Sequence, residues 1–485
     1  MMSALPNNAD LLMSNGWIDG AEVNADNKFA VRNPATFEVI ANVSDLGAQH
    51  AREAVAAANR AFTAWRETPL QERVDLVLRW ASLVEENAAE LGHIVCLETG
   101  KPIAQAEGEA IQCASLLRWF AAQAPQLATT EPPANSVEQH NYTIKQAVGV
   151  VACITPWNFP AAAVIVKAGA AIVAGCTTVV KPSEETPLIA LALAKLSAAA
   201  GIPNGVFNIV PCQDPTAVGD VLCQSDDVRM LSFTGSIRIG KQLYASCGNT
   251  VKRIALELGG NAPFIVFEDA DLEKALDGAM GARFYNSGQI CVGANRYYAH
   301  SSIYDRFASA FAERVAQMQP GDGFDAKSDI GPMINRAAVD RLNGLVDDAV
   351  AAGAEVLAGG RQDDDSSLFF APTILTNMGA TMQARDAEIF GPVACLYRFD
   401  DENEVLEQAN NTEAGLSAYV YTNDRERLLR FATAMEAGVI GANTANIFAN
   451  DLPFGGIKQS GIGREHGADC LDEYVEIKSI CMGAI

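Results

Sequence analysis

The spacing of apolar residues divides the chain into a helical N-terminal part and two later parts in which strands and helices alternate. Residues 1–50 hold short strand-like pieces between turn signals. From Ala48 to about Ala124, apolar residues recur at the spacing of amphipathic helices. Polar residues and the Pro132-Pro133 pair break this pattern over Thr129–Asn141. This break predicts an excursion from the body of the fold, for which a hairpin is one form.

Continuous apolar runs begin after residue 147 and alternate with helical patterns. Five runs are predicted as strands: Val148–Ile154, Cys176–Val180, Val206–Val210, Val228–Phe233 and Val251–Leu256. The segments between them are predicted as helices: one that starts at Ala161, one from Thr186 to about Ala200, and two over Val218–Cys223 and Ile237–Cys247. Apolar strands that alternate with helices predict an α/β fold with a parallel sheet covered on both faces.

A second alternating region follows. Its predicted strands are Phe264–Phe267, Tyr297–His300, Val393–Phe399 and Leu416–Tyr421. Its predicted helices are Asp271–Phe284, Ile303–Gln317, Ala337–Ala352 and Glu402–Asn410. The sequence shows no internal repeat and no low-complexity linker, so domain boundaries have to be placed from motifs.

Composition and charge narrow the class of protein. A chain of 485 residues is too long for one core, which predicts two domains or more. A content of 49% hydrophobic and 19% charged residues is typical of a packed globular protein. The net charge of −24 argues against nucleic acid and anionic membranes as partners.

The cysteines and the apolar stretches predict a cytoplasmic protein. The 11 cysteines are scattered without a CxxC pair, which fits a reducing compartment and predicts no metal site. Met1–Asp10 lacks the basic and apolar regions of a signal peptide. The longest apolar stretch, Pro160–Val180, is interrupted by Lys167, so it reads as a buried helix and strand and not as a membrane span.

A candidate nucleophile, Cys291, ends the run Asn286-Ser287-Gly288-Gln289-Ile290-Cys291. Glycine and amide residues beside a thiol allow a tight turn and supply hydrogen-bond donors, both of which a thiol nucleophile needs. A small buried core thiol is the alternative interpretation. The choice depends on whether the chain supplies a base, an oxyanion donor and a redox partner.

Glu257 is the candidate base. It lies where a predicted parallel strand ends, which is where such sheets bind ligands, and Gly259-Gly260 follows it. A solvated loop carboxylate is the alternative. Free thiols and carboxylic acids differ by roughly 4 pKa units, so direct proton transfer from Cys291 is uphill by about 6 kcal/mol. Glu257 therefore needs a desolvating pocket, or acts mainly on a water molecule.

Asn158 is the candidate oxyanion donor. Pro156 and Pro160 flank it and restrict its backbone, so its amide can donate to an oxyanion together with the Cys291 N–H. An Asx turn or a helix cap is an equally good interpretation of this segment alone.

A dinucleotide is the candidate redox partner. Gly235 and Gly240 flank the start of a predicted helix whose N–H groups can hold a phosphate, although the spacing is not GxGxxG and a plain helix start is the alternative. After another predicted strand, Lys181 can bond a ribose, and Glu184 can accept from the adenosine 2′-OH.

Taken together, these motifs resemble the aldehyde dehydrogenase superfamily over essentially the whole chain. Within it, the sequence looks most like bacterial succinate-semialdehyde dehydrogenases, for example over Leu256 to Ala270 and in Ala294-Asn295-Arg296. The matching motifs are Pro156-Trp157-Asn158-Phe159-Pro160, Lys181-Pro182, Phe233-Thr234-Gly235-Ser236, Glu257-Leu258-Gly259-Gly260, Gly288-Gln289-Ile290-Cys291, Glu388-Ile389-Phe390-Gly391-Pro392 and Pro453-Phe454-Gly455-Gly456-Ile457-Lys458.

The resemblance implies oxidation of an aldehyde to the acid through a Cys291 thiohemiacetal and thioester, with Glu257 as the base for hydrolysis and Asn158 in the oxyanion hole. Glu465 would be a secondary carboxylate on the water or proton path. The residues implied to bind the dinucleotide are Thr155, Pro156, Trp157, Lys181, Ser183, Glu184, Gly235, Ser236, Leu258, Gly259, Glu388 and Phe390.

The resemblance also implies a fold of three parts. A Rossmann-like coenzyme domain would cover residues 1–124 and 146–257, and an α/β catalytic domain residues 258–464. Residues 125–145 and 465–485 would form a β-strand flap that joins subunits into a homodimer or homotetramer.

Glu184 bears on the choice of cofactor. Related NADP-preferring enzymes carry a small residue three positions after the lysine, where this chain has Glu184. A carboxylate would repel a 2′-phosphate, so we expect NAD to be preferred, with NADP left open.

Three residues depart from the family's carboxylate site. Succinate-semialdehyde dehydrogenases commonly bind the distal carboxylate with two arginines and a serine, whose places hold Val166, Tyr285 and Phe448 here. Neither valine nor tyrosine mimics a bidentate arginine, and a surface role is expected for nearby Arg283. The pocket therefore suits a longer aliphatic or aromatic aldehyde. The alternatives are a true succinate- or glutarate-semialdehyde dehydrogenase with a non-standard carboxylate site, and a catalytically silent binding protein.

Overall fold

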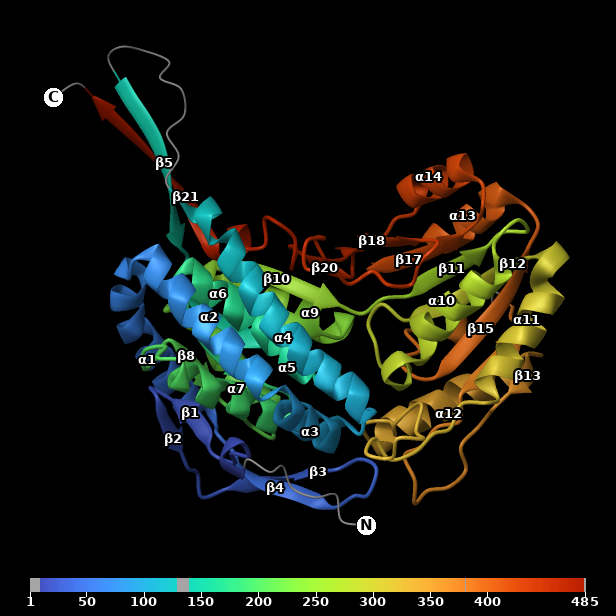
Figure 1. Cartoon of the computed structure of the whole chain (residues 1–485), viewed down its shortest axis with the longest axis horizontal. Coiled ribbons are helices and arrows are strands. Elements are labelled where there is room, and N and C mark those ends of the chain that lie inside the picture. The colour runs from blue at the N-terminus through green and yellow to red at the C-terminus, as the bar shows by residue number, and fades with distance from the viewer. Residues whose placement is uncertain (1–8, 129–138, 380, 484–485) are drawn as a thin grey trace.

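Two β-sheets, each covered by helices, form the body of the molecule, and a two-stranded flap projects from it (Figure 1). The structure is a computed structural model that describes residues 9–128, 139–379 and 381–483. The part built on the first sheet and the part built on the second sheet lie side by side, with the chain crossing between them after β10 (Arg253–Leu258).

The first sheet confirms the predicted parallel arrangement. In spatial order its eight strands are β2 (Ala21–Val23), β1 (Gly16–Ile18), β8 (Phe207–Ile209), β7 (Thr177–Lys181), β6 (Val150–Ile154), β9 (Val228–Gly235), β10 and β20 (Gly461–Ile462). The run from β8 to β10 is parallel. Strands β6 and β7 are buried at every position, which explains their continuous apolar sequence.

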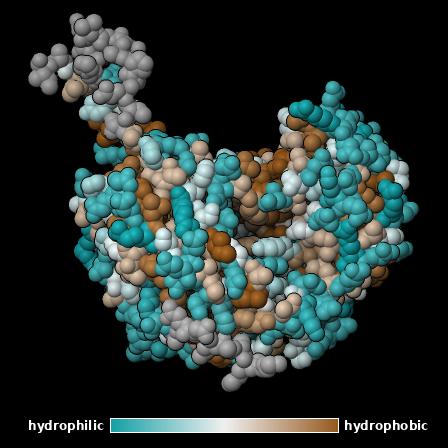
Figure 2. All heavy atoms as spheres, viewed as in Figure 1, coloured by the Kyte–Doolittle hydropathy of each residue, from teal (hydrophilic) through white to brown (hydrophobic). Residues whose placement is uncertain are grey.

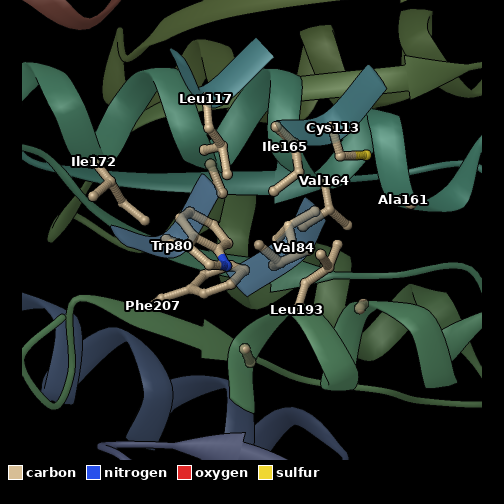
Figure 3. Close-up of a cluster of buried hydrophobic side chains, with 14 of the residues drawn as sticks. Trp80, Val84, Cys113, Leu117, Ala161, Val164, Ile165, Ile172, Leu193 and Phe207 are labelled. Carbon is tan, nitrogen blue, oxygen red and sulfur yellow. The ribbon is translucent and has the colours of Figure 1, made fainter. Parts of the chain in front are cut away.

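Alternate residues of β6 pack on opposite faces of this sheet. Val151 and Cys153 belong to one hydrophobic cluster with helices α2 (Leu70–Glu86), α4 (Ile103–Gln123) and α7 (Pro187–Ala199). Val150 and Ala152 belong to another cluster, with helices α1 (Ala48–Glu67), α8 (Pro215–Gln224) and α9 (Ile237–Cys247). Figure 3 shows the first cluster, where the fully buried Trp80 lies 5.4 Å from the Phe207 ring. Both faces of the sheet are therefore closed to water.

The second sheet has seven strands. In spatial order they are β13 (Glu355–Ala358), β14 (Thr373–Thr376), β15 (Val393–Phe399), β12 (Ala294–His300), β11 (Ala262–Val266), β17 (Ser417–Tyr421) and β18 (Val439–Ala442). All neighbours are parallel except β13 and β14. Its helices are α10 (Leu272–Phe284), α11 (Ser301–Val315), α12 (Arg336–Ala351), α13 (Glu402–Asn410) and α14 (Arg425–Ala434).

Several elements differ from the sequence-based prediction. The strand predicted from Val251 begins only at Arg253, because Val251 adopts a left-handed conformation (φ 51°) and is 90% exposed. The helix predicted from Ala161 is divided by a π-helical turn, with α5 (Pro160–Val164), η3 (Ile165–Gly169) and α6 (Ala170–Ala174) as its three parts. Strands β13, β14 and β18 and helix α14 were not predicted, since short strands and a charged surface helix give weak periodicity.

The flap pairs two distant segments. Strand β5 (Gln139–Ala147) is antiparallel to β21 (Val475–Gly483), from Val475 opposite Ala147 to Gly483 opposite Gln139. The excursion predicted over Thr129–Asn141 lies mostly outside the described residues. The described part of this excursion, β5, thus pairs with the C-terminal strand.

Among the residues that the structure describes, no helix is long and apolar enough to cross a membrane.

Candidate active site

The strand order of the first sheet reverses between β6 and β9. In a doubly wound sheet a ligand binds at such a switch point, at the carboxyl ends of the strands. The residues predicted to bind the dinucleotide follow these ends: Thr155, Pro156 and Trp157 after β6, Lys181, Ser183 and Glu184 at β7, Gly235 and Ser236 at β9, and Leu258 and Gly259 at β10. The topology therefore brings these predicted residues to one edge.

Lys181 and Glu184 form an ion pair at this edge, with 3.5 Å between Nζ and Oε2. The Lys181 side chain is buried, whereas 42% of the Glu184 side chain is exposed. The Thr155 N–H donates to the Lys181 carbonyl over 3.1 Å, which fixes the β6 and β7 ends relative to each other. Ser183 Oγ accepts from the Glu185 N–H, a local turn contact. Glu184 is thus the member of this group that offers its charge to solvent.

Ser236 is the N-cap of α9. Its Oγ accepts from the Ile239 N–H over 3.4 Å, so the plain helix-start interpretation describes the contacts of this segment. Gly235 lies tightly against the Phe233 ring, where a Cβ atom would come within 2.4 Å of it. The phosphate role of this segment stays a prediction.

Cys291 follows three residues in the left-handed conformation. Asn286, Ser287 and Gly288 have φ values of 49°, 56° and 71°. Such a run is strained for residues with a Cβ and persists only where its surroundings fix it. Asn286 Nδ2 donates to the Gln289 carbonyl, and Ser287 Oγ donates to the Gly331 carbonyl over 2.9 Å. The turn therefore holds Cys291 on a rigid loop that leads into β12.

Arg283 is buried and donates a hydrogen bond to this loop, so the prediction of a surface role for it is wrong. Its side chain is fully buried and donates to the Gly288 carbonyl over 2.8 Å, the Ala294 carbonyl over 3.0 Å and Asn295 Oδ1 over 2.7 Å. Burial lowers the pKa of Arg283. The guanidinium is thus held by Gly288 in the loop over residues 286–293 that carries Cys291, called the nucleophile loop below, and by the first two residues of β12. Its complete burial keeps it away from a substrate carboxylate.

The segment that follows β10 packs against Cys291, the candidate nucleophile. A Cβ atom at Gly260 would lie 2.6 Å from the Cys291 carbonyl oxygen, so glycine is required for this approach. The sequence suggested that this glycine pair approaches a ligand, but the neighbours that require it are Cys291 and Glu388. Burial raises the pKa of the Cys291 thiol, and the nearby Glu257 and Glu388 carboxylates raise it further. The thiol is thus protonated at rest and has to lose its proton before it can add to a carbonyl carbon.

Glu257 has the desolvated surroundings that a base for this thiol or for water requires. Only 6% of the residue is exposed, and neither carboxylate oxygen makes a hydrogen bond of ordinary geometry with the described residues, although the nearby Gly456 N–H acts to lower its pKa. Burial raises the pKa of Glu257 well above its usual range, and the negative charge of Glu465 adds to this. A buried carboxylate without partners is costly, which is typical of a functional group.

Glu465 repels the charged form of Glu257 and forms an ion pair with Lys167. Lys167 Nζ lies 2.7 Å from Glu465 Oε1 and 3.2 Å from Ser232 Oγ. Lys167 lies within the π-helical turn η3, and such turns often occur at functional sites. Its positive charge lowers the pKa of Glu257, in opposition to Glu465. Lys167 is a functional candidate that sequence reasoning noticed only as an interruption of an apolar stretch.

Asn158 lies next to the nucleophile loop. Its Nδ2 donates to the Gln289 carbonyl over 3.0 Å, and the residue is 5% exposed. Its own carbonyl accepts from Lys101 Nζ over 2.7 Å and from Asn286 Nδ2 over 3.0 Å. The structure therefore brings Asn158, Glu257 and Cys291 together from three distant parts of the chain.

Glu388 and Phe390 lie opposite the switch point, before β15. Glu388 Oε1 accepts from the Gly260 N–H over 3.3 Å, and burial raises the pKa of Glu388 to about 7. The Phe390 ring meets Trp157 edge-on at 5.5 Å. Arg341 donates to the carbonyls of Glu388 and Phe390 and fixes their backbone. Sequence reasoning missed Arg341, which has no motif.

Two of the three predicted pocket residues stack on rings of the hydrophobic cluster against which Cys291 packs. This cluster includes Phe454, and Phe159 also packs against it. Phe159 stacks on Tyr285 at 6.2 Å, and Phe454 stacks on Phe448 at 5.2 Å. Tyr285 and Phe448 are 42% and 46% exposed. Figure 2 shows apolar residues gathered in the hollow between the two parts of the molecule.

Val166 does not join this aromatic group. It is buried in the π-helical turn and belongs to the hydrophobic cluster of the first sheet. Tyr285 and Phe448 are therefore the aromatic residues of the predicted pocket, whereas Val166 is packed inside the first part of the molecule.

Comparisons with known proteins agree with this geometry. A family model described as "Aldehyde dehydrogenase family" matches residues 17–480. The chain is 44% identical to an NADP(+) succinate-semialdehyde dehydrogenase of Escherichia coli strain K12, over 98% of this chain and 99% of that protein. It is also 44% identical to a glutarate-semialdehyde dehydrogenase of Pseudomonas aeruginosa, with the same coverage. A crystal structure of an E. coli NADP-dependent enzyme superposes with a TM-score of 0.97 at 44% identity, over 99% of this chain and 100% of that one.

Proposed function

The chain belongs to the aldehyde dehydrogenase family, and we propose that it oxidises an aldehyde to the carboxylic acid with Cys291 as the nucleophile. The observation that carries this proposal is the convergence of the Cys291 loop, the Asn158 amide and the unpartnered Glu257 carboxylate. NAD(P)+ supplies the chemistry of hydride acceptance when it is bound.

The cycle begins when the Cys291 thiolate adds to the aldehyde carbon. The oxyanion of the resulting thiohemiacetal accepts hydrogen bonds from Asn158 Nδ2 and the Cys291 N–H, of which one donor is typically worth about 10²–10³ in rate. Loss of the carbon-bound hydrogen as hydride leaves a thioester on Cys291. Glu257 then takes a proton from water, the hydroxide attacks the thioester, and the acid leaves while the Cys291 thiolate is restored.

Hydrolysis is favoured over acyl transfer to coenzyme A because Glu257 provides a base. Its partner-free, desolvated carboxylate has a raised pKa, which suits proton abstraction from water. Glu465 and Lys167, 2.7 Å apart, are proposed to pass the proton onward.

The residues at the switch point fit a dinucleotide. Lys181 and Glu184 form an ion pair at the end of β7 and would bind the adenosine ribose. Glu388 is a buried carboxylate held close to Gly259, where a Cβ atom would lie 2.3 Å from Glu388 Oε2. Glu388 would hold the nicotinamide ribose, and Trp157 and Phe390 would pack beside it.

We expect Glu184 to favour NAD over NADP, and a Glu184→Ser variant to shift this preference. Like charges about 4 Å apart near a protein surface repel by about 4 kcal/mol before screening by salt, so removing the carboxylate relieves repulsion of a 2′-phosphate and frees Lys181 to bind it. The ratio of kcat/KM for NADP over NAD should rise roughly 10- to 100-fold. Absorbance at 340 nm measures it.

Two results would contradict this expectation. Comparable kcat/KM for the two cofactors in the wild type would overturn the NAD preference, for which the NADP(+) in the name of the E. coli relative is a counter-argument. An unchanged ratio in Glu184→Ser would show that another residue discriminates. A Glu22→Ser variant, on the exposed edge strand β2, is the matched control.

The substrate is proposed to be a longer aliphatic or aromatic aldehyde. Tyr285 and Phe448 present aromatic surface beside the Cys291 cluster. The nearby cations are engaged, since Lys101 pairs with Glu109 and Arg283 bonds the nucleophile loop. A second candidate, oxidation of succinate or glutarate semialdehyde, is favoured by the names of the relatives at 44% identity.

A panel of aldehydes distinguishes these candidates. With hexanal, benzaldehyde, betaine aldehyde and succinate semialdehyde, we expect hexanal or benzaldehyde to give kcat/KM roughly 100-fold above succinate semialdehyde, whose carboxylate lacks a cationic partner. A Tyr285→Arg variant returns a cation and should raise kcat/KM for succinate semialdehyde. Strong wild-type activity on succinate semialdehyde alone would overturn the apolar pocket. No activity on any aldehyde would favour a silent binding protein.

The flap is proposed to join subunits into a homodimer or homotetramer. Strand β21 carries Ile477, which is 67% exposed, on a two-stranded sheet that stands away from the body (Figure 1). An apolar residue on an exposed sheet edge favours pairing with another chain.

A further inference from the structure

A buried ion pair lies behind the proposed oxyanion donor. Lys101 follows helix α3 (Ala88–Thr99), and Glu109 lies in the second turn of α4. The Lys101 Nζ and Glu109 Oε2 atoms are 2.7 Å apart, and the two side chains are 1% and 2% exposed. An ammonium group buried this deeply needs further acceptors for its three donors, so its other contacts show what it holds.

The second contact of Lys101 is the backbone of Asn158. Nζ donates to the Asn158 carbonyl oxygen over 2.7 Å. Asn286 Nδ2, from the nucleophile loop, donates to the same oxygen over 3.0 Å. The backbone N–H of Asn286 in turn donates to Gln105 Oε1 of α4. One carbonyl thus joins the Lys101 segment and the strained turn before Cys291 to Asn158.

Glu109 holds the chain on the other side of Asn158. Its Oε1 accepts from the N–H groups of Ala161 and Ala162 over 2.9 and 3.1 Å. These belong to the first turn of α5, whose N–H groups have no partner within the helix, and a carboxylate there is favoured by the helix dipole. The ion pair therefore fixes the backbone at Asn158 and again three residues later.

The third neighbour of Lys101 is the aromatic ring of Phe159. Nζ lies 4.3 Å from the centre of the Phe159 ring, which stacks on Tyr285. A cation at this distance from a ring is attracted to its face. The same ammonium thus contacts the backbone of the oxyanion donor and the aromatic residue that follows it.

We propose that the Lys101–Glu109 pair is the positioning device that sets the Asn158 amide for the oxyanion on Cys291. The inference rests on the proposed function, because it assigns these residues a role through Asn158. A displacement of about 1 Å in a positioned group can cost on the order of 10²-fold in rate. Neither Lys101 nor Glu109 touches the reacting atoms in this role.

The alternative is a pair that only stabilises the fold. Removing one partner would leave a buried charge without compensation, and that variant can fail to fold. The double variant Lys101→Met/Glu109→Leu removes both charges at similar volume and avoids this penalty. It is therefore the variant that separates positioning from folding.

The test is a double-mutant cycle between this variant and Asn158→Ala. Acylation of the enzyme by 4-nitrophenyl acetate releases nitrophenolate as Cys291 takes the acetyl group, and it requires neither a dinucleotide nor knowledge of the aldehyde. We expect Lys101→Met/Glu109→Leu to slow acylation by on the order of 10²-fold and Asn158→Ala by about 10²–10³-fold. The combination should be no slower than Asn158→Ala alone, because Asn158→Ala keeps the carbonyl but has no amide left to position.

Arg73→Met is the matched control. Arg73 is also a buried cation that donates to backbone carbonyls, those of Arg66, Thr68 and Val173, but it contacts neither Asn158 nor the nucleophile loop in the described structure. We expect it to lower the melting temperature while its folded fraction acylates at the wild-type rate. Effects of the pair and of Asn158→Ala that multiply, or an unchanged rate in the pair variant, would overturn positioning. A wild type that neither acylates nor reduces NAD(P)+ would overturn the proposed function and this inference with it.

Discussion

Replacing Cys291 with serine is expected to lower kcat by roughly 10⁴-fold or more, the scale of losing a catalytic nucleophile. The hydroxyl is nearly the size of the thiol, but it is far harder to deprotonate and a much weaker nucleophile. Deprotonation of a serine at this position is especially unfavourable, because burial and the Glu257 and Glu388 carboxylates already disfavour an anion at position 291. Reduction of NAD(P)+ at 340 nm with the best aldehyde of the panel measures the loss.

The control for this experiment is Cys481→Ser. Cys481 is exposed on β21, away from the cluster around Cys291, so its replacement should leave kcat unchanged. Melting temperatures of both variants should match the wild type within a few degrees. Cys291→Ser with more than a tenth of wild-type turnover would exclude Cys291 as the nucleophile.

The second large effect is expected for Glu257→Gln. The amide keeps the size of the side chain but cannot take a proton from water, so the thioester should form and then persist. We expect a rapid burst of reduced cofactor close to one equivalent per site, followed by steady turnover lowered by about 10²–10⁴-fold. Stopped-flow absorbance at 340 nm separates the two phases. Steady turnover at the wild-type level would rule out Glu257 as the base.

The pH dependence of the steady rate gives a second measurement of the same group. Burial and Glu465 raise the pKa of Glu257 well above its usual range, so the active carboxylate form becomes populated only as pH rises through that raised value. Deacylation should therefore accelerate with pH in the wild type, and this ascending limb should vanish in Glu257→Gln. A wild-type limb centred near pH 4 would indicate a solvated carboxylate.

The site lies where the carboxyl ends of strands of the first sheet face the loops that lead into strands of the second sheet. The carboxyl ends of β6, β9 and β10 carry Asn158, Ser236 and Glu257 at or just beyond them, and the loops before β12 and β15 carry Cys291 and Glu388. Hydrogen bonds such as Gly260 N–H to Glu388 Oε1 join the two edges. The first sheet thus carries the residues proposed to bind the dinucleotide, and the strained turn before the second sheet carries the proposed nucleophile.

Much of this arrangement could be predicted from the sequence. Apolar runs alternating with helical patterns predicted both parallel sheets, because strands buried on both faces must be apolar throughout. The motifs around Cys291, Glu257 and Asn158 were found as local residue patterns, and the structure brings them together. Elements with weak local patterns, such as β18 and α14, were missed because the prediction relied on local patterns alone.

The sequence by itself determined the class of fold, the family and the candidate nucleophile, since each depends on residues close together along the chain. Only the tertiary structure decided that Arg283 is buried against the nucleophile loop and that the Glu257 carboxylate oxygens lack ordinary hydrogen-bond partners among the described residues. It also decided that Lys101 donates a hydrogen bond to the Asn158 carbonyl. The physical reason is that desolvation and hydrogen bonding depend on neighbours supplied by distant segments. No local pattern encodes which charge will lose its water when those segments pack.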